Sequence, residues 1–548
     1  MVTRLLKHFS RRRTSQMQAA SPKQAQNSAG GFSFVLDDQA RLERFLILGS
    51  EGGSYYASER ALTVANATCV ERGLDANGPA TVERIAALSE AGRAPKNSPA
   101  IFALAIAAGH RDQATRQAAL AALPRVCRTG AHLFEFVTAV EQFRGWGRGL
   151  RRAVARWYLD KDPRALAYQV VKYRQRNGWS HRDVLRKAGG AIGPHSLEHE
   201  AVLRWIVDGI DGFARERKIT RGDVLISYGS LTPEQLPALI EGVEQLNRCN
   251  DPKLAAALID RYRLTHEMVR GALKQHAVVW EALLEHMPVG ALLRHLGKLT
   301  KVGVIARFGD GARTVAAALG DEDRLAKARL HPLAVLTALR IYARGHGQRG
   351  KLSWTPVTKV VDALDRAFYT CFRTVVPSHK RVIVALDVSG SMGWGEIAGL
   401  PGVTPAVGSA AMAMITLQSE PEVEVMAFSD QLRKVKLSSR QRLDDVVKQL
   451  GNIPMGGTDC SLPMQWALEQ GIEVDAFVVY TDNETWHGQV HPHQALRAYR
   501  DRMGIPAKLI VAGMTATEFS IADPDDAGML DVVGFDSAAP AIMADFLR

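Results

Sequence analysis

The spacing of apolar residues changes once along this 548-residue chain, close to Pro377. Between about Leu42 and Phe372, apolar residues recur every three or four positions, and Gly, Pro and Asn interrupt the pattern at short intervals. After Pro377, short apolar runs rich in Val and Ile alternate with segments of helical spacing. Helices followed by alternating strands and helices predict an α-helical region joined to an α/β domain.

The helical region is expected to consist of stacked helix pairs. Segments such as TVERIAALSEAG (81–92) and PEQLPALIEGVEQLN (233–247) each present an apolar face that a lone helix cannot bury. Stacked pairs bury such faces against their neighbours, and the poor exact repetition favours a HEAT-like array. We therefore expect a HEAT-like α-helical repeat over residues 31–372, with a single irregular helical domain as the alternative.

Residues 373–548 are expected to form a doubly wound α/β sheet. The run RVIVALDV (381–388) is typical of a buried strand. Four more such runs follow, at residues 423–430, 476–483, 508–514 and 530–536. Helical segments lie between them, which favours parallel strands joined by crossover helices. Ligands of such sheets bind beyond the carboxyl ends of the strands, so polar residues there are candidate ligands.

The charge is divided unequally between the two regions. Residues 1–370 carry 55 Lys and Arg against 35 Asp and Glu, a net +20, whereas residues 371–548 carry 14 against 22, a net −8. A basic region of this size favours a polyanionic partner, above all nucleic acid, with a solvated basic face of no function as the alternative. Residues 1–30 contain no acid, and their basic, Gln- and Ser-rich composition predicts a disordered arm.

Composition also limits the cellular setting. The five cysteines are few and widely spaced, and no pair has zinc-site spacing, which predicts a reducing compartment without a disulfide framework. No apolar run reaches the roughly 18 residues that a membrane span requires. We therefore expect a cytoplasmic protein without a membrane partner.

Polar side chains follow two of the expected strands. Asp387 closes the first strand and is followed by Ser389 and Ser391. Asp482 follows a later strand, and Thr458 lies in a Gly-rich loop that opens a helix. Parallel strands bring their carboxyl ends to one edge, so two carboxylates and three hydroxyls are expected to meet there. An all-oxygen ligand set suits a divalent metal, above all Mg²⁺, and leaves a position for an outside oxygen.

Two alternatives to this metal site remain open. Asp, Ser and Thr are common in turns and helix caps, so the five residues can be turn formers alone. With Asp459 as a third carboxylate, the site can be that of a metal-dependent nuclease, although a two-metal nuclease uses more carboxylates. The sequence lacks the nucleophile-elbow, aspartyl-phosphate and phosphate-loop motifs, which argues against an enzyme.

The segment 144–187 combines cations with aromatic residues. It holds thirteen Lys and Arg against three Asp, with six aromatic residues interleaved. Two cationic rows have helical spacing, namely Arg148, Arg152 and Arg156, and Lys172 with Arg176. Cationic rows address phosphates, and neighbouring rings can stack exposed bases, although the aromatic residues individually fit a helix core. The rows as a group therefore predict a nucleic-acid surface.

Several longer stretches resemble a known family. ALDVSGSM (385–392), GGTDCSLPMQWA (456–467) and TDNETW (481–486) are similar to the metal-ion-dependent adhesion site of von Willebrand factor A domains. Together with RFLILGSEGGSYY (44–56) and KYRQRNGWSHRDVLR (172–186), they resemble the Ro autoantigen family, whose helical part is the TROVE module. The resemblance covers about residue 28 to the C-terminus and implies a TROVE ring (31–372) and an A domain (373–548), whereas the disordered basic arm (1–30) is predicted from composition alone.

The resemblance implies a bacterial Ro protein in which the A domain closes a ring of helical repeats. Its outer basic surface is expected to bind small structured Y-type RNAs, and its central opening single-stranded 3′ ends of misfolded or immature RNAs. It implies a monomer without enzymatic activity, an adaptor for an exoribonuclease in RNA quality control, rRNA maturation or stress. The alternative is a metal-dependent adaptor whose A domain binds an acidic protein partner.

The expected RNA-binding residues combine the cationic rows with positions that match the family. They are Arg148, Arg152, Arg156, Lys172, Arg174, Arg176, His181, Arg182 and Arg186. His181 can stack on a base or contact a phosphate, and packing in the core is its alternative role.

Overall fold

The computed structural model describes most of the chain. The described residues are 13–49, 67–94, 96–189, 196–214, 218–221, 224–227, 232–328, 330, 332–347, 351–371, 376–394, 397, 403–514, 518–533 and 538–548. Within them, no helix is long and apolar enough to cross a membrane.

Helices dominate the chain up to residue 370. They are α2 (Asp38–Leu48), α3 (Thr68–Ala91), α4 (Ser98–Gly109), α5 (Gln113–Val126), α6 (Gly130–Val140), α7 (Arg148–Leu159), α8 (Pro163–Lys172), α9 (His181–Ala188), α10 (Leu197–Asp208), α11 (Ala238–Arg248), α12 (Pro252–Tyr262), α13 (Ala277–His286), α14 (Val289–Lys301), α15 (Asp310–Gly320), α16 (Glu322–Ala328), α17 (Pro332–Arg344) and α18 (Thr358–Thr370). Two hairpins interrupt them: β3 (Gln175–Arg176) with β4 (Trp179–Ser180), and β5 (Lys218–Arg221) with β6 (Val224–Ser227).

Local sequence signals place several helix starts. Asp162 accepts hydrogen bonds from the backbone of Arg164 and Ala165, immediately before the proline that begins α8. Asp251 caps α12 in the same way, again ahead of a proline. A capping acid satisfies otherwise unpaired N–H groups, and proline has no N–H to leave unpaired in the first turn.

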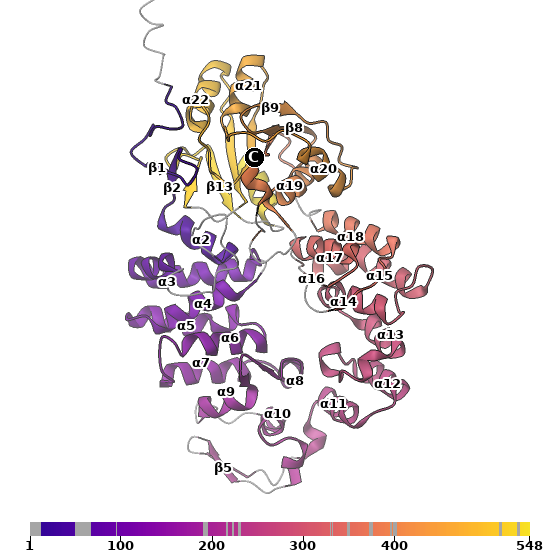
Figure 1. The fold of residues 1–548 in the computed structure, drawn as a ribbon. Helices are drawn as coiled ribbons and strands as arrows, with labels where there is room; N and C mark the ends of the chain where they lie inside the picture. The colour runs from indigo at the N-terminus through magenta and orange to yellow at the C-terminus, as the bar shows by residue number, and fades with distance from the viewer. Residues whose placement is uncertain are drawn as a thin grey trace, which may run out of the picture.

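The helices form an arc that the α/β domain closes. In Figure 1 the arc runs from α2 through α10 to α18, and both of its ends lie beside that domain. Neighbouring helices pack in sequence along the arc, as α4 with α5 and α12 with α13, and α8 contacts α11 across its lower part. The predicted helical repeat ring followed by an α/β domain is confirmed.

The α/β domain is built on a six-stranded mixed sheet of order β13-β11-β10-β7-β8-β9. Its strands are β7 (Arg381–Asp387), β8 (Glu422–Phe428), β9 (Leu432–Lys434), β10 (Ala476–Thr481), β11 (Lys508–Gly513) and β13 (Met529–Val533), and all pairs are parallel except β8 with β9. The helices are α19 (Pro405–Ser419), α20 (Leu443–Gly451), α21 (Leu462–Gln470), α22 (Pro492–Met503) and α23 (Ala538–Leu547).

Alternate residues of the central strands enter two separate cores. Val384 and Val478 pack with α19 and α23 in one core, whereas Ile383 and Phe477 pack with α21 and α22 in the other. Side chains on a strand point alternately to the two faces of its sheet, so both faces are covered by helices. The predicted doubly wound sheet is therefore confirmed.

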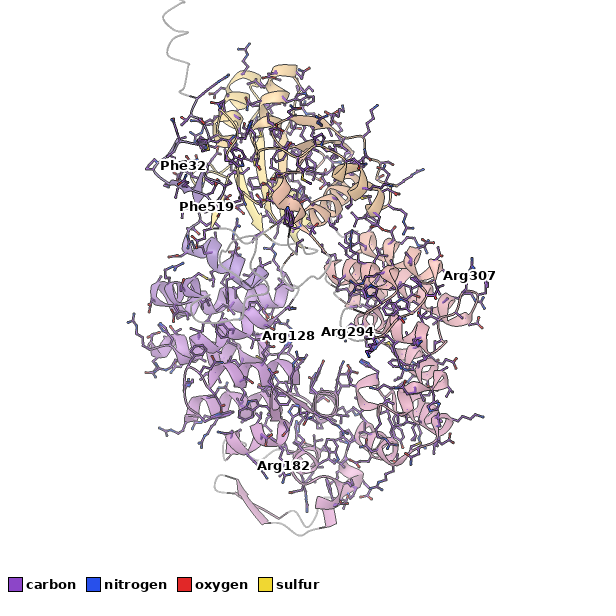
Figure 2. All side chains as sticks on the ribbon, viewed as in Figure 1. Phe32, Arg128, Arg182, Arg294, Arg307 and Phe519 are labelled. Carbon is purple, nitrogen blue, oxygen red and sulfur yellow. The ribbon has the colours of Figure 1, made fainter. Side chains whose placement is uncertain are left out.

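Residues 13–36, here called the N-terminal segment, pack against the α/β domain. The segment contains β1 (Gln24–Gln26) and β2 (Phe32–Val35), and β2 also pairs with β12 (Phe519–Ser520) to form a three-stranded sheet. Figure 2 labels Phe32 and Phe519 where the two parts meet. The prediction of a disordered arm is wrong for residues 13–30, because their polar side chains pair with distant loops, which composition cannot reveal. Residues 1–12 of that arm lie outside the described residues.

The arc meets the α/β domain through two junctions. At the α2 side, the buried Arg44 guanidinium lies 2.9 Å from a carboxylate oxygen of Asp531, which belongs to the edge strand β13. At the α18 side, Arg442 of the α/β domain pairs with Asp362 at 2.7 Å. The chain itself also crosses on this side, from Thr370 to Arg381. Closure at the α2 side therefore depends on non-covalent contacts.

Candidate metal centre and basic surface

The predicted metal ligands lie at one edge of the sheet. Asp387 ends β7 and Asp482 follows β10, and these two strands are parallel neighbours. Thr458 lies in the loop before α21, and its carbonyl accepts hydrogen bonds from the backbone of Trp486 and His487 at 2.9 and 3.0 Å. The loop that holds Thr458 is thereby tied to the loop that holds Asp482.

The loop after β7 orients the first carboxylate and the two serines. The Ser389 N–H donates to Asp387 Oδ1 at 2.8 Å, and the Thr481 hydroxyl donates to Oδ2 at 2.7 Å. The hydroxyl oxygens of Ser389 and Ser391 lie 3.1 Å apart, within the reach of one ion. The sequence-predicted oxygen donors of this loop therefore converge.

The carboxylates at this edge are buried close to one another. Asp387 is 1% exposed and Asp482 is 0% exposed. Burial raises the pKa of Asp387, and the negative charge of Asp482 raises it further. Burial and the same Asp482 charge raise the pKa of Glu484 to about 7. A cation between these oxygens would relieve the repulsion, so the donor set fits a hard divalent ion.

Asp459 serves a different purpose from the predicted ligands. Its Oδ1 accepts hydrogen bonds from the Gln16 side-chain amide at 2.8 Å and from both the backbone and the hydroxyl of Ser461 at 2.9 and 2.5 Å. These bonds commit the carboxylate to the N-terminal segment and to the start of α21. The nuclease alternative needs Asp459 as a third metal-binding carboxylate, and the bonds to Oδ1 compete with that role.

Helix α7 presents the first predicted cationic row. Arg148, Arg152 and Arg156 are all exposed, whereas Leu150 and Trp157 on the opposite face are buried in the core. Within the part of the chain that the structure describes, none of these three arginines forms an ion pair with an acidic side chain. The row is therefore free to contact phosphates.

The second predicted row does not lie on one helix face. Helix α8 ends at Lys172, and Arg176 belongs to a hairpin whose turn places Asn177 and Gly178 at φ 52° and 79°. An Asn-Gly turn of this kind joins antiparallel strands and ends the helix, so the expected i, i+4 helical pair is wrong.

The cations from Lys172 to Arg176 differ in their exposure. The Lys172 ammonium donates to the Tyr168 hydroxyl at 2.9 Å and lies 3.7 Å from Glu267, and its side chain is only 16% exposed. Arg174 and Arg176 are exposed on the hairpin. The hairpin therefore offers two surface cations, while Lys172 connects α8 to the other side of the arc.

His181 is in the core, so its expected place on the RNA surface is wrong. It is buried, its Nδ1 lies 2.8 Å from the Tyr158 hydroxyl, and its ring centre is 4.6 Å from that of Phe134. Its neighbours Arg182 and Arg186 on α9 are exposed. The core role that the sequence left open as an alternative is therefore the observed one, and it fixes the start of α9.

Replacing His181 by Ala is expected to lower the free energy of unfolding by about 2–4 kcal/mol. The change empties space in the core and leaves the Tyr158 hydroxyl without its partner. Denaturant unfolding measures the effect, with Arg182→Ala as the exposed control. Equal stability of the two variants would contradict the buried position of His181.

The buried position of His181 also makes the stability of the protein depend on pH. Burial lowers the pKa of His181 to about 3, whereas an unfolded histidine titrates near 6.5. Below pH 6.5 the unfolded chain therefore binds a proton that the folded chain excludes, so stability falls by up to about 1.4 kcal/mol per pH unit for this group until pH 3. Unfolding curves between pH 7 and pH 4 should show a shallower decline in His181→Ala.

Cations also face the centre of the ring, and sequence reasoning did not single them out. Figure 2 places Arg128 and Arg294 on opposite sides of the central opening. Both are exposed, and Arg128 donates to the Ser89 hydroxyl at 3.0 Å. Arg128 lies in the loop between α5 and α6, and Arg294 lies on α14, so no local spacing could have revealed that both face the opening.

Comparisons with known proteins agree with this architecture. A TROVE domain model matches residues 25–340, and a Ro60 vWA domain model matches residues 381–547. The chain is 42% identical over 538 residues to the RNA-binding protein RO60 of Deinococcus radiodurans, covering 97% of each protein. It is 35% identical to the RNA-binding protein RO60 of Caenorhabditis elegans, covering 97% of this chain and 91% of that protein.

A solved structure shares the fold as a whole. The crystal structure of the Deinococcus radiodurans RO (RSR) protein matches with a TM-score of 0.69 and 41% sequence identity, covering 93% of this chain and 99% of that one. A helical ring closed by an A domain thus defines the class to which the chain belongs. The chain is a member of the Ro60 family of RNA-binding proteins.

Proposed function

We propose that this protein forms a ribonucleoprotein with small structured Y-type RNAs and also binds single-stranded 3′ ends of misfolded or immature RNAs. The exposed arginines of α7, α9 and the β3–β4 hairpin are the observation that carries the proposal. Structured RNA occupies this outer surface, and single-stranded ends enter the opening that Arg128 and Arg294 face.

The biological role that follows is that of an adaptor in RNA quality control, rRNA maturation or stress. The protein acts in the cytoplasm as a monomer, presents bound RNA to an exoribonuclease and has no catalytic activity of its own. Incubation of labelled RNA with the protein and Mg²⁺ is expected to leave the RNA intact. Cleavage that disappears in Asp387→Ala would instead establish a metal-dependent nuclease.

Salt dependence tests the RNA-binding proposal. Each phosphate contact releases counterions, so the logarithm of the affinity for structured RNA should fall steeply and linearly with the logarithm of salt concentration, by about 0.7–0.9 per contact. Filter binding with a hairpin RNA and with a single-stranded 3′ tail measures both sites. An affinity that does not change with salt for either RNA would contradict the proposal.

The A domain is proposed to hold Mg²⁺ through Asp387, Ser389, Ser391, Thr458 and Asp482. The buried, like-charged carboxylates and the convergent hydroxyls support this assignment. The ion would neutralise the carboxylates and offer a position to an outside oxygen ligand. These residues would hold and orient it, and the RNA-binding surface lies on the other domain.

One observation favours a second function beside the metal site. Trp394 and Met455 are each 67% exposed, which is unusual for side chains of this size. The Trp394 N–H donates to the Ser391 carbonyl at 3.2 Å, and Met455 packs close to Gly390. The A domain can therefore act as an adaptor for a protein partner. An acidic residue of the partner would bind the metal, and an apolar residue beside it would contact Trp394 and Met455. Capture of a partner protein that requires Mg²⁺ and becomes weaker in Trp394→Ala would support this second function.

A further inference from the structure

The side chain of Gln16 joins the two loops that carry Thr458 and Asp482. Gln16 is 0% exposed, although it lies more than 400 positions earlier in the sequence. Its amide nitrogen donates to Asp459 Oδ1 at 2.8 Å, and its amide oxygen accepts from the Thr485 hydroxyl. Asp459 follows Thr458 directly, and Thr485 belongs to the loop that begins with Asp482. One carboxamide from the N-terminal segment therefore spans both metal loops.

Further hydrogen bonds connect the N-terminal segment to the loop that begins with Asp482. The Asn27 side-chain amide donates to the Thr485 carbonyl at 2.9 Å, and the Ala29 N–H donates to a Glu484 carboxylate oxygen at 3.1 Å. A Cβ on Gly31 would lie only 2.1 Å from the Thr485 carbonyl oxygen, so this close approach requires glycine. The N-terminal segment thus forms the outer wall of the loop that holds Asp482.

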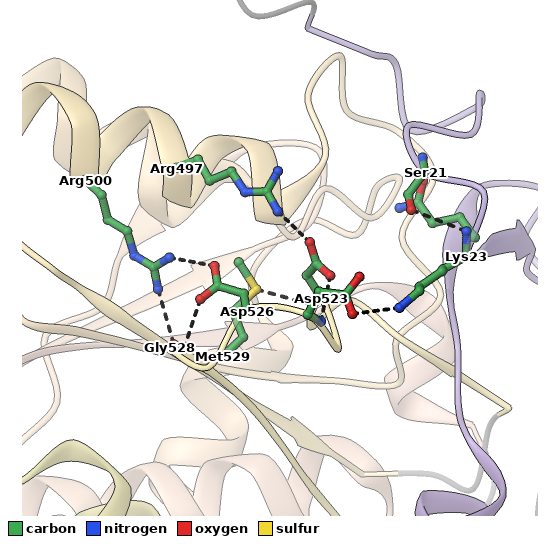
Figure 3. A network of polar contacts seen from close by, with 10 residues as sticks. Ser21, Lys23, Arg497, Arg500, Asp523, Asp526, Gly528 and Met529 are labelled. Atoms are coloured by element: carbon green, nitrogen blue, oxygen red, sulfur yellow. Dashed lines mark hydrogen bonds and ion pairs between the residues drawn. The ribbon is translucent and has the colours of Figure 1, made fainter.

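The contacts at the rim of this interface differ from those at its centre. Lys23 forms an ion pair with Asp525 at 2.6 Å. Figure 3 shows Arg497 and Arg500 reaching to Asp523 and Asp526 in the neighbouring turn. The Lys23 and Asp525 side chains are largely exposed, and exposed ion pairs contribute little to stability. The buried amides of Gln16 and Asn27, rather than this rim, fix the segment on the metal loops.

The same segment begins the helical arc. It leads directly into α2, on the side of the ring where closure depends on non-covalent contacts. We propose that the N-terminal segment completes the wall of the metal site, so that binding of a divalent cation and closure of the ring are thermodynamically linked. Gln16 is a positioning residue in this account, because it acts on the metal loops through Asp459 and Thr485. The proposal rests on the Mg²⁺ site proposed above.

Linkage makes the effect reciprocal. If the segment strengthens cation binding by fixing the loops, the cation must strengthen docking of the segment by the same factor. Hydrogen exchange reports docking through two amides that donate to the α/β domain: the Gln16 N–H donates to the Gly488 carbonyl at 2.9 Å, and the Leu36 N–H donates to the Glu518 carbonyl at 3.1 Å. Docking can therefore be followed without reference to RNA.

The test combines Mg²⁺ calorimetry with hydrogen exchange of the full chain. In the wild type, Mg²⁺ is expected to slow exchange of peptides covering residues 13–36. Gln16→Ala is expected to weaken Mg²⁺ binding about tenfold and to speed exchange of those peptides, because three buried hydrogen bonds are lost. Asn27→Ala, which leaves Gln16 in place, should change both quantities in the same direction.

Two matched variants separate the linkage from general loosening. Lys23→Ala removes only the exposed rim pair, and Arg442→Ala removes the ion pair at the other junction. Both should leave Mg²⁺ affinity unchanged. Equal Mg²⁺ affinity in the wild type, Gln16→Ala and Asn27→Ala would overturn the linkage but not the metal site. The linkage would also be overturned if Mg²⁺ slowed hydrogen exchange in the metal loops but not in residues 13–36. Failure of the wild type to bind Mg²⁺ would overturn the metal site itself.

Discussion

Replacing Arg148, Arg152 and Arg156 together by Glu is expected to weaken binding of structured RNA about a hundredfold or more at low salt. All three side chains are exposed on one face of α7, so the substitution removes three phosphate contacts and adds repulsion without disturbing the core. The slope of log affinity against log salt should fall by about 2–3. Filter binding over a salt series measures both quantities.

A charge-matched triple variant in the A domain provides the control. Arg433, Lys436 and Arg440 are exposed on the acidic domain, and their replacement by Glu changes the net charge by the same amount. This variant should keep most of the affinity and the full salt slope. Equal losses in the two triple variants would mean that RNA responds only to the overall charge of the protein.

Asp387→Ala is expected to reduce Mg²⁺ affinity by at least about a hundredfold while RNA binding persists. Asp387 supplies one of only two carboxylates in the predicted ligand set, and charged ligands dominate Mg²⁺ binding. The proposed metal site lies in the acidic domain and the exposed arginines lie in the helical ring, so the two functions should separate. Calorimetry with Mg²⁺ and filter binding with RNA measure them independently.

The stability of this variant gives a further check. Burial and the Asp482 charge disfavour an ionised Asp387 in the metal-free protein. The substitution removes this cost together with the hydrogen bonds from Ser389 and Thr481, so the melting temperature of the variant should stay close to that of the metal-free wild type. Asp525→Ala removes an exposed acid of the same domain and should keep Mg²⁺ affinity. Loss of RNA binding by a folded Asp387→Ala protein would refute the separation of the two sites.

Features with a strong local signal were predictable from the sequence. The helical segments expected between the strand runs are present, and the strand runs at residues 381–388 and 476–483 became β7 and β10. The reason is that hydrophobic period and proline position are local properties. The grouping of Asp387 with Asp482 followed from a general rule, because carboxyl ends of parallel strands meet at one edge.

Features that depend on distant contacts were not predictable in the same way. Gln16 is a polar residue in a basic stretch, and only its bonds to loops more than 400 positions away make it part of the core. His181 stands between exposed cations in the sequence, yet Tyr158 and Phe134 enclose it. The Asn177-Gly178 turn is an exception, since this dipeptide is a known hairpin signal that helical spacing concealed.

RNA that copurifies with the protein from its own cells would show whether the protein carries RNA. The protein is purified at low salt, and the RNA that accompanies it is sequenced. We expect a single small structured RNA together with fragments of larger RNAs that end in single-stranded 3′ tails. Recovery of no RNA above background would contradict this expectation and would favour the protein-adaptor function of the A domain.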